Sequence, residues 1–128
     1  LRLLSVHRAS RLMLCRKHPN DLDYQRDLSV SYDRMGDLYV RMGDGGAARE
    51  AFQKSLEIFK KLSEGEPARA DYQRDLFVSY YKLGTADPAR GRSFFEKSLQ
   101  ILLQLEAAGR LDPADRPYID NLRQLANS

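Results

Sequence analysis

The side chains of this sequence that could do chemistry are few and scattered. Cys15 and His18 stand three residues apart and could share one helix face, as a thiol and the base that activates it would. A single pair of this kind is common by chance, so we favour a half-buried structural cysteine. His7 and His18 lie eleven positions apart with no acidic residue between them, and this spacing does not suit a metal site.

Two aspartates and a glycine run are the other candidates. Asp33 and Asp37 are spaced i,i+4, so a helix would hold both on one face, but the next repeat offers no second acidic pair to complete a glycosidase or metal site. We interpret them as an exposed acidic stripe. The run "GDGG" at 43–46 is too short for a phosphate loop and lacks the Lys-Ser or Lys-Thr that would follow. We therefore expect no enzyme, no cofactor and no metal.

Composition is that of a globular chain. With 128 residues, of which 42% are hydrophobic and 30% charged, the chain can bury a core and differs from disordered proteins. No apolar run approaches the roughly 18 residues of a membrane-spanning helix, so no membrane association is expected. A single cysteine cannot form an internal disulfide, which favours a reducing, cytoplasmic setting. Because the sequence begins with Leu1, we expect it to be part of a longer protein.

Charge is unevenly distributed along the chain. Residues 1–18 hold five basic residues and no acid, which leaves 16 basic residues against 18 acidic ones in residues 19–128. A basic segment could contact nucleic acid or an acidic partner. No aromatic residue is interleaved with these basic residues for base stacking, so we favour a solvated helix face and expect no nucleic acid.

One phrase of ten residues occurs twice. "DYQRDLSVSY" at 23–32 returns as "DYQRDLFVSY" at 71–80, with nine residues identical at an offset of 48. A second block matches at an offset of 43, from Phe52–Leu62 to Phe95–Leu105, so five residues are missing between the two blocks of the second copy. Length changes are tolerated in turns, and each copy is therefore expected to be two elements joined by a turn.

Both elements show the apolar spacing of helices. Apolar residues recur at steps of three and four over 24–42 and again over 48–62, and no strand alternation is present. "GDGG" is expected to make the first turn, and "TADPA" at 85–89 the second, with Asp87 capping the next helix. "DPAD" at 112–115 is expected to open a last helix, whose apolar stripe would be Tyr118, Leu122 and Leu125. We expect about six helices.

This organisation resembles the tetratricopeptide (TPR) repeat. The family pattern combines aromatic, small and Leu-Gly positions at fixed spacing over two helices. The first copy matches it at Tyr32, Met35, Gly36, Tyr39, Ala48, Phe52 and Ser55, and the second at Tyr80, Leu83, Gly84, Gly91, Phe95 and Ser98. The unit of 48 residues exceeds the family's usual length of about 34 and is similar to long-repeat bacterial TPR arrays.

The resemblance implies an all-α fold in which helical hairpins stack as a short right-handed solenoid. The single domain would comprise 1–18 as a helix of a preceding unit, 19–66 as repeat 1, 67–109 as repeat 2 and 110–128 as a C-terminal capping helix. The second copy would cover the apolar face that the first leaves open. The function implied is a protein–protein interaction scaffold within a larger bacterial protein.

The resemblance also implies a binding surface, because the first helices of TPR hairpins line a concave face. The positions expected to contact a partner segment are Asp33, Asp37, Val40, Val78, Tyr81 and Lys82. Chaperone-binding TPR domains carry lysine and asparagine where Asp33 and Asp37 stand, so capture of a C-terminal carboxylate is not expected. A basic or amphipathic segment of a protein is the expected partner.

An alternative function remains open. Residues 1–18 could leave apolar side chains uncovered, and two copies could cover each other around a twofold axis. The chain would then be a self-association or array-stacking element, a weak homodimer formed through the N-terminal helix, with no separate ligand.

Overall fold

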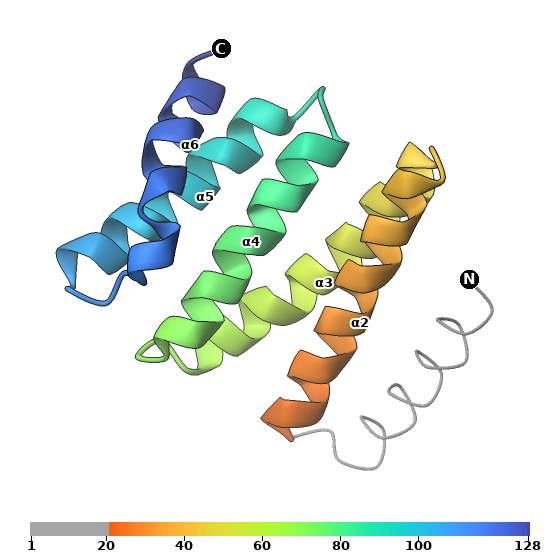
Figure 1. Cartoon of the computed structure of the whole chain (residues 1–128). Helices are drawn as coiled ribbons and strands as arrows, with labels where there is room; N and C mark the ends of the chain where they lie inside the picture. Colours follow the sequence, from red (N-terminus) through yellow and green to blue (C-terminus); the bar gives the residue numbers. More distant parts are fainter. Residues whose placement is uncertain (1–20) are drawn as a thin grey trace. The chain divides into compact units, whose positions relative to one another are not determined.

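The computed structural model describes residues 21–128, and their regular structure is entirely helical (Figure 1). The elements are α2 (Leu22–Arg41), α3 (Gly45–Gly65), α4 (Ala70–Ala86), α5 (Gly91–Ala107), the short 3₁₀ helix η1 (Pro113–Asp115) and α6 (Pro117–Asn127). The all-α expectation is confirmed for this range, which contains no strand. The helix expected over residues 1–18, with Cys15, His7 and His18, lies outside the described residues.

The chain divides into two compact units. The first unit ends at Leu62, and the second unit comprises Ser63–Ser128. The boundary lies near the C-terminal end of α3, shortly before the sequence changes from one repeat to the next at residues 66 and 67. The first unit thus contains α2 and most of α3, and the second contains α4, α5, η1 and α6.

Capping interactions determine where the helices of the first unit begin and end. The carboxylate of Asp21 accepts hydrogen bonds from the backbone N–H groups of Asp23 and Tyr24, which would otherwise lack partners at the start of α2. At its end, Gly43 has φ +77°, and Asp44 N–H donates to Tyr39 O at 2.9 Å. This left-handed glycine is a common helix terminator. The turn predicted at "GDGG" is therefore confirmed at Gly43 and Asp44, whereas Gly45 and Gly46 already belong to α3.

In the first unit α2 and α3 approach closely at a glycine. A Cβ atom at Gly36 would overlap the ring of Phe52, so only glycine allows this approach. About two turns before Gly36 on α2, the buried Ser29 Oγ donates a hydrogen bond to the backbone oxygen of Ser55 at 2.9 Å and lies 3.0 Å from Ser55 Oγ. The apolar side chains buried in this unit come from both helices, and they include Leu28, Met35, Ala48, Phe52, Leu56 and Phe59.

The second unit repeats the glycine–phenylalanine contact of the first at the offsets seen in the sequence. A Cβ atom at Gly84 would lie 2.5 Å from Phe95 Cε1, so α4 and α5 also meet at a glycine and a phenylalanine. A cation–π contact recurs as well: Lys97 Nζ lies 5.8 Å from the Tyr80 ring centroid, where the first unit has Lys54 Nζ 5.7 Å from the Tyr32 ring. The two hairpins therefore share these two contacts, whereas the Ser29–Ser55 hydrogen bond has no equivalent in the second hairpin, where Phe77 takes the place of Ser29.

Two expected helix starts are wrong. Asp87 ends α4, donating its N–H to Leu83 O, and α5 begins only at Gly91 after a turn in which Asp87 Oδ2 accepts from Arg90 Nε. Asp112 does cap a helical turn, through Ala114 N–H, but that turn is η1 and α6 begins at Pro117. Pro117 has no N–H to donate to a carbonyl of the preceding turn, so an α-helix starting at Pro113 cannot continue unbroken through it.

Helix α6 packs against α5, as expected of a capping helix, but with a different face. Its buried residues are Ile119, Leu122 and Ala126, whereas Tyr118 is 39% exposed. Of the expected stripe, Leu122 is buried, Leu125 is half-buried, and Tyr118 is partly exposed while its ring contacts Phe77 of α4. Arg92 Nε–H of α5 donates to Ala126 O at 2.9 Å and holds the end of α6.

Candidate partner-binding surface

One face of α4, together with one residue of α6, lines a hollow in the second unit. Its volume is about 260 Å³. The lining residues on α4 recur at steps of three and four over about three turns, so they form a continuous stripe. They are Arg74, Phe77, Val78, Tyr81, Lys82 and Thr85, and α6 contributes Tyr118. We refer to this feature as the α4–α6 hollow.

Aromatic rings form the walls of the α4–α6 hollow. The centroid of the Tyr118 ring lies 5.5 Å from that of Phe77 and 5.7 Å from that of Tyr81, and both pairs are edge to face. Tyr81 makes a third edge-to-face contact with Phe95, at 5.8 Å between ring centroids. Aromatic pairs prefer this geometry, and each such contact contributes about 0.5–1.5 kcal/mol beyond area burial. Phe77 is buried while Tyr118 remains partly exposed, so the hollow has a packed floor and an accessible wall.

An ion pair holds the lining residue Arg74. Arg74 Nε–H and Nη2–H donate to Asp115 Oδ2 and Oδ1 at 2.7 and 3.0 Å, a bidentate arrangement that fixes the guanidinium plane. The hydrogen bond to Asp115 raises the pKa of Arg74 above its usual value. The Asp115 side chain is 2% exposed and the Arg74 side chain 46% exposed, so a buried carboxylate orients an accessible cation.

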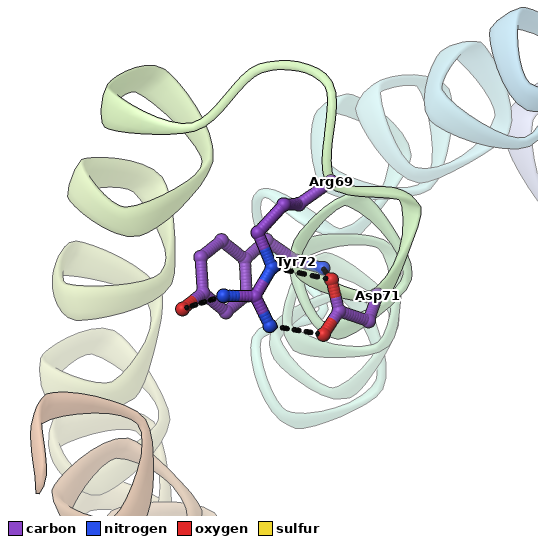
Figure 2. A network of polar contacts seen from close by, with 3 residues as sticks. All are labelled: Arg69, Asp71 and Tyr72. Carbon is purple, nitrogen blue, oxygen red and sulfur yellow. Dashed lines mark hydrogen bonds and ion pairs between the residues drawn. The ribbon is translucent and has the colours of Figure 1, made fainter. Parts of the chain in front are cut away.

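A second polar network fixes the start of α4. Figure 2 shows the guanidinium of Arg69 between the carboxylate of Asp71 and the hydroxyl of Tyr72. Arg69 donates to both Asp71 oxygens at 3.1 and 2.7 Å and to Tyr72 Oη at 2.8 Å, and its guanidinium carbon lies 3.9 Å from the centroid of the buried Tyr72 ring. The hydrogen bond to Asp71 raises the pKa of Arg69. Arg69 is the N-cap residue of α4, and its side chain makes no capping hydrogen bond to the helix backbone. It stabilises the start of α4 through its contacts with the side chains of Asp71 and Tyr72 instead.

The structure gathers half of the sequence-predicted site residues. Val78, Tyr81 and Lys82 line the α4–α6 hollow together. The other three lie on α2 in the first unit, where Val40 is 54% exposed and Asp37 half-buried. Asp33 is only 9% exposed, so the interpretation of Asp33 and Asp37 as an exposed acidic stripe is wrong at Asp33.

Sequence reasoning did not assign Arg74, Phe77 or Tyr118 to this surface. A signal for Phe77 was present, because it is the one residue that differs between the two copies of the ten-residue phrase. Nothing comparable marked Tyr118 or the pairing of Arg74 with Asp115, since α6 has no complete counterpart in the repeats. Arg74 and Asp115 are 41 positions apart in the sequence.

Two further observations concern other classes of function. Within residues 21–128, no three histidine, cysteine, aspartate or glutamate side chains converge as metal ligands would. No helix in that same range is both long and apolar enough to cross a membrane.

Comparison with known proteins adds no further assignment. Neither a protein-family model, nor a curated protein, nor a solved structure matches the chain significantly.

Proposed function

We propose that this chain is a TPR-like interaction module whose second unit holds a short segment of a partner protein in the α4–α6 hollow. The observation that carries the proposal is the hollow itself, in which the lining combines rigid aromatic walls with two cations. Tyrosine and arginine are enriched among the residues that contribute most to binding at protein interfaces. Three of the lining residues, Val78, Tyr81 and Lys82, are those that the TPR resemblance implies for partner contact.

The repeated contacts support the TPR-like part of the proposal. Glycine of the first helix meets phenylalanine of the second in both units, at Gly36–Phe52 and Gly84–Phe95. Such a hairpin exposes its first helix to a ligand while its second helix packs inside an array. In the second unit it is the first helix of the hairpin, α4, that lines the hollow.

The size of the hollow favours side chains of a peptide over a cofactor. Small-molecule sites usually enclose about 300–1,000 Å³ and bury most of their ligand, and the α4–α6 hollow is smaller at about 260 Å³. A larger hollow of about 400 Å³ at the start of α5 is mostly lined by polar side chains, among them Arg92 and Glu96, which pair with each other at 3.5 Å. It offers fewer apolar side chains for an anchor residue.

The experiment is peptide display against the immobilised chain, followed by ¹⁵N NMR titration with a selected peptide. We expect resonances of α4 and α6 around Val78 and Tyr118 to shift, with micromolar affinity, or about −8 kcal/mol. Val78→Gln should weaken binding, whereas Val40→Gln, which alters an exposed valine of α2, should have a smaller effect.

Two outcomes would contradict the proposal. Binding that Val78→Gln leaves unchanged and Val40→Gln abolishes would move the site to α2. A chain that selects no peptide but dimerises with rising concentration in sedimentation velocity would favour the self-association alternative.

A further inference from the structure

We propose that Asp115 determines which segments the α4–α6 hollow accepts, because it occupies and neutralises Arg74 and so keeps that arginine from binding a carboxylate of the partner. The occupant is then an uncharged segment with one apolar anchor side chain. This inference rests on the proposed function and deepens it, since it names a specificity-determining residue that acts on the hollow through Arg74.

One edge of the Arg74 guanidinium is already engaged. Its Nε–H and Nη2–H donate to the two oxygens of Asp115 at 2.7 and 3.0 Å, which is the bidentate pairing that arginine would use for a carboxylate of a partner. The Asp115 side chain is 2% exposed, so its own charge is withdrawn from solvent. A carboxylate from outside that took this edge would leave Asp115 buried without its counter-charge, which is costly.

Further acidic residues add to this compensation. The pKa of Arg74 is raised by its hydrogen bond to Asp115, and the charges of Asp112 and Asp75 raise it further. Lys82, the other cation of the lining, makes an interaction of its own. Charge therefore gives a carboxylate no advantage in the hollow.

The apolar part of the lining is what remains for recognition. Val78 lies one turn beyond Arg74 on α4, and the rings of Tyr81 and Tyr118 stand edge to face with their centroids 5.7 Å apart. An apolar side chain that enters there is removed from water without leaving a polar group or a charge unpaired. A segment with an apolar anchor among uncharged residues therefore fits this lining.

The acidic residue at position 115 is not a feature of the repeat. Residues 112–122 align with residues 66–76 at an offset of 46, with one proline, one alanine, one tyrosine and one leucine identical. In this alignment Asp115 stands where the preceding copy has Arg69. Arg69 pairs with Asp71 of its own copy, whereas Asp115 pairs with Arg74 of α4. The bidentate neutralisation of Arg74 thus depends on one side chain that the repeat does not supply.

The test compares two labelled nonapeptides by fluorescence anisotropy with the full chain at low ionic strength. Both have a central leucine, and they differ only two residues to either side of it, with glutamine in one peptide and glutamate in the other. Two extended residues span about 6.6 Å and the four residues from Arg74 to Val78 about 6 Å, so one of these positions comes level with Arg74 in either peptide direction. We expect the parent protein to bind the two peptides with affinities that agree within about twofold.

Asp115→Asn is the decisive variant, because asparagine keeps an acceptor for Arg74 and removes the charge. We expect it to bind the glutamate peptide about fivefold tighter than the glutamine peptide, as for an exposed ion pair, and to lose this preference as salt is raised. Adding Arg74→Gln to Asp115→Asn should abolish the preference, which locates it at Arg74.

Asp120→Asn is the matched control. It makes the same substitution at a position of α6 whose side chain is 89% exposed, and it should bind both peptides as the parent does. Circular dichroism melts of each variant verify that the fold is retained. A residue that only stabilised the fold would weaken both peptides alike when substituted, so the ratio of the two affinities reports on specificity.

The outcomes separate the two proposals. A parent protein that already binds the glutamate peptide about fivefold tighter overturns the inference without any variant. If Val78→Gln weakens both peptides while Asp115→Asn leaves their affinities equal, the hollow binds peptides but Asp115 does not set its preference. If Val78→Gln weakens neither these peptides nor any selected by display, the proposed function fails together with this inference.

Discussion

Gly36 and Gly84 lie where the second helix of each hairpin leaves no room for a Cβ atom on the first. At Gly84 the approach is constrained further, because a Cβ atom at Gly91 of α5 would lie 2.9 Å from the backbone oxygen of Gly84. Neither Gly36 nor Gly84 is required by backbone conformation, since neither has positive φ. Each is required by the lack of room for a side chain, which is a tertiary requirement satisfied by one residue type.

We expect Gly36→Ala to destabilise the protein by about 1–3 kcal/mol, because the added methyl group must displace the Phe52 ring. This is opposite in sign to helix propensity, by which alanine is favoured over glycine by about 1 kcal/mol. Gly65→Ala is the control, since a Cβ atom at Gly65 meets nothing within 4 Å. Urea unfolding should show a lower free energy of unfolding for Gly36→Ala alone, and equal stabilities of the two variants would refute the packing argument.

Tyr80 connects burial to the pH dependence of stability. Burial raises the pKa of its phenol above the usual value of 10, and the charge of Glu64 raises it further. The folded protein therefore holds this proton more tightly than the unfolded chain. The resulting stabilisation is complete below about pH 10 and is lost as the pH rises through the folded-state pKa.

We expect the melting temperature to fall more steeply above about pH 10 in the parent than in Tyr80→Phe, which keeps the ring but removes the titrating hydroxyl. Thermal unfolding of both proteins from about pH 8 to pH 11 measures this difference. Parallel curves would show that other groups govern the alkaline loss of stability.

The single difference between the two copies of the repeated phrase matters at the scale of elements. In α2 this position holds Ser29, whose hydroxyl donates a hydrogen bond to the backbone oxygen of Ser55 in α3. In α4 it holds Phe77, whose ring contacts Tyr118 of α6, while Ser98 of α5 donates its hydroxyl to the Phe77 backbone oxygen at 3.0 Å. The same helix position thus serves a hairpin contact in one unit and supports the capping helix in the other.

Phe77→Ser should remove this support. We expect a loss of about 3–5 kcal/mol, as for other truncations of buried aromatic side chains. Amide hydrogen exchange should accelerate most in α6, because α6 loses the ring against which Tyr118 packs. Tyr118→Phe keeps the ring contact and should stay close to the parent, and α6 amides that remain protected in Phe77→Ser would contradict this role.

At the scale of the whole molecule, the chain consists of two compact units, each with its own glycine–phenylalanine contact. Each unit also buries its own set of apolar side chains. Local stability therefore need not be uniform along the chain, since proteins open in cooperative parts that often coincide with supersecondary motifs.

The matched glycine substitutions test this organisation. Gly84→Ala should accelerate hydrogen exchange mainly in α4, α5 and α6, whereas Gly36→Ala should do so mainly in α2 and in α3 up to Leu62. Mass spectrometry of peptic fragments under native conditions measures both. The same loss of protection throughout both variants would mean that the chain opens as one cooperative body.

Much of the fold was determined by the sequence alone, for a local reason. Helical spacing of apolar residues over 24–42 and 48–62 predicted α2 and α3, and left-handed glycine accounts for the turn at Gly43. The repeat then predicted α4 and α5 by analogy, and it brought Val78, Tyr81 and Lys82 onto one helix face. Information of this kind is contained in residues close together in the chain or in a second copy of them.

The rest of the candidate site depends on contacts between residues that are far apart in the sequence. The burial of Asp33, the ion pair of Arg74 with Asp115 and the placement of Tyr118 beside Phe77 could not be read from spacing. Pro117 displaced the expected start of α6, and with it the face that the helix buries. These features depend on how a helix without a complete counterpart in the repeats docks on its neighbours, and such docking is set by side-chain packing over long sequence separations.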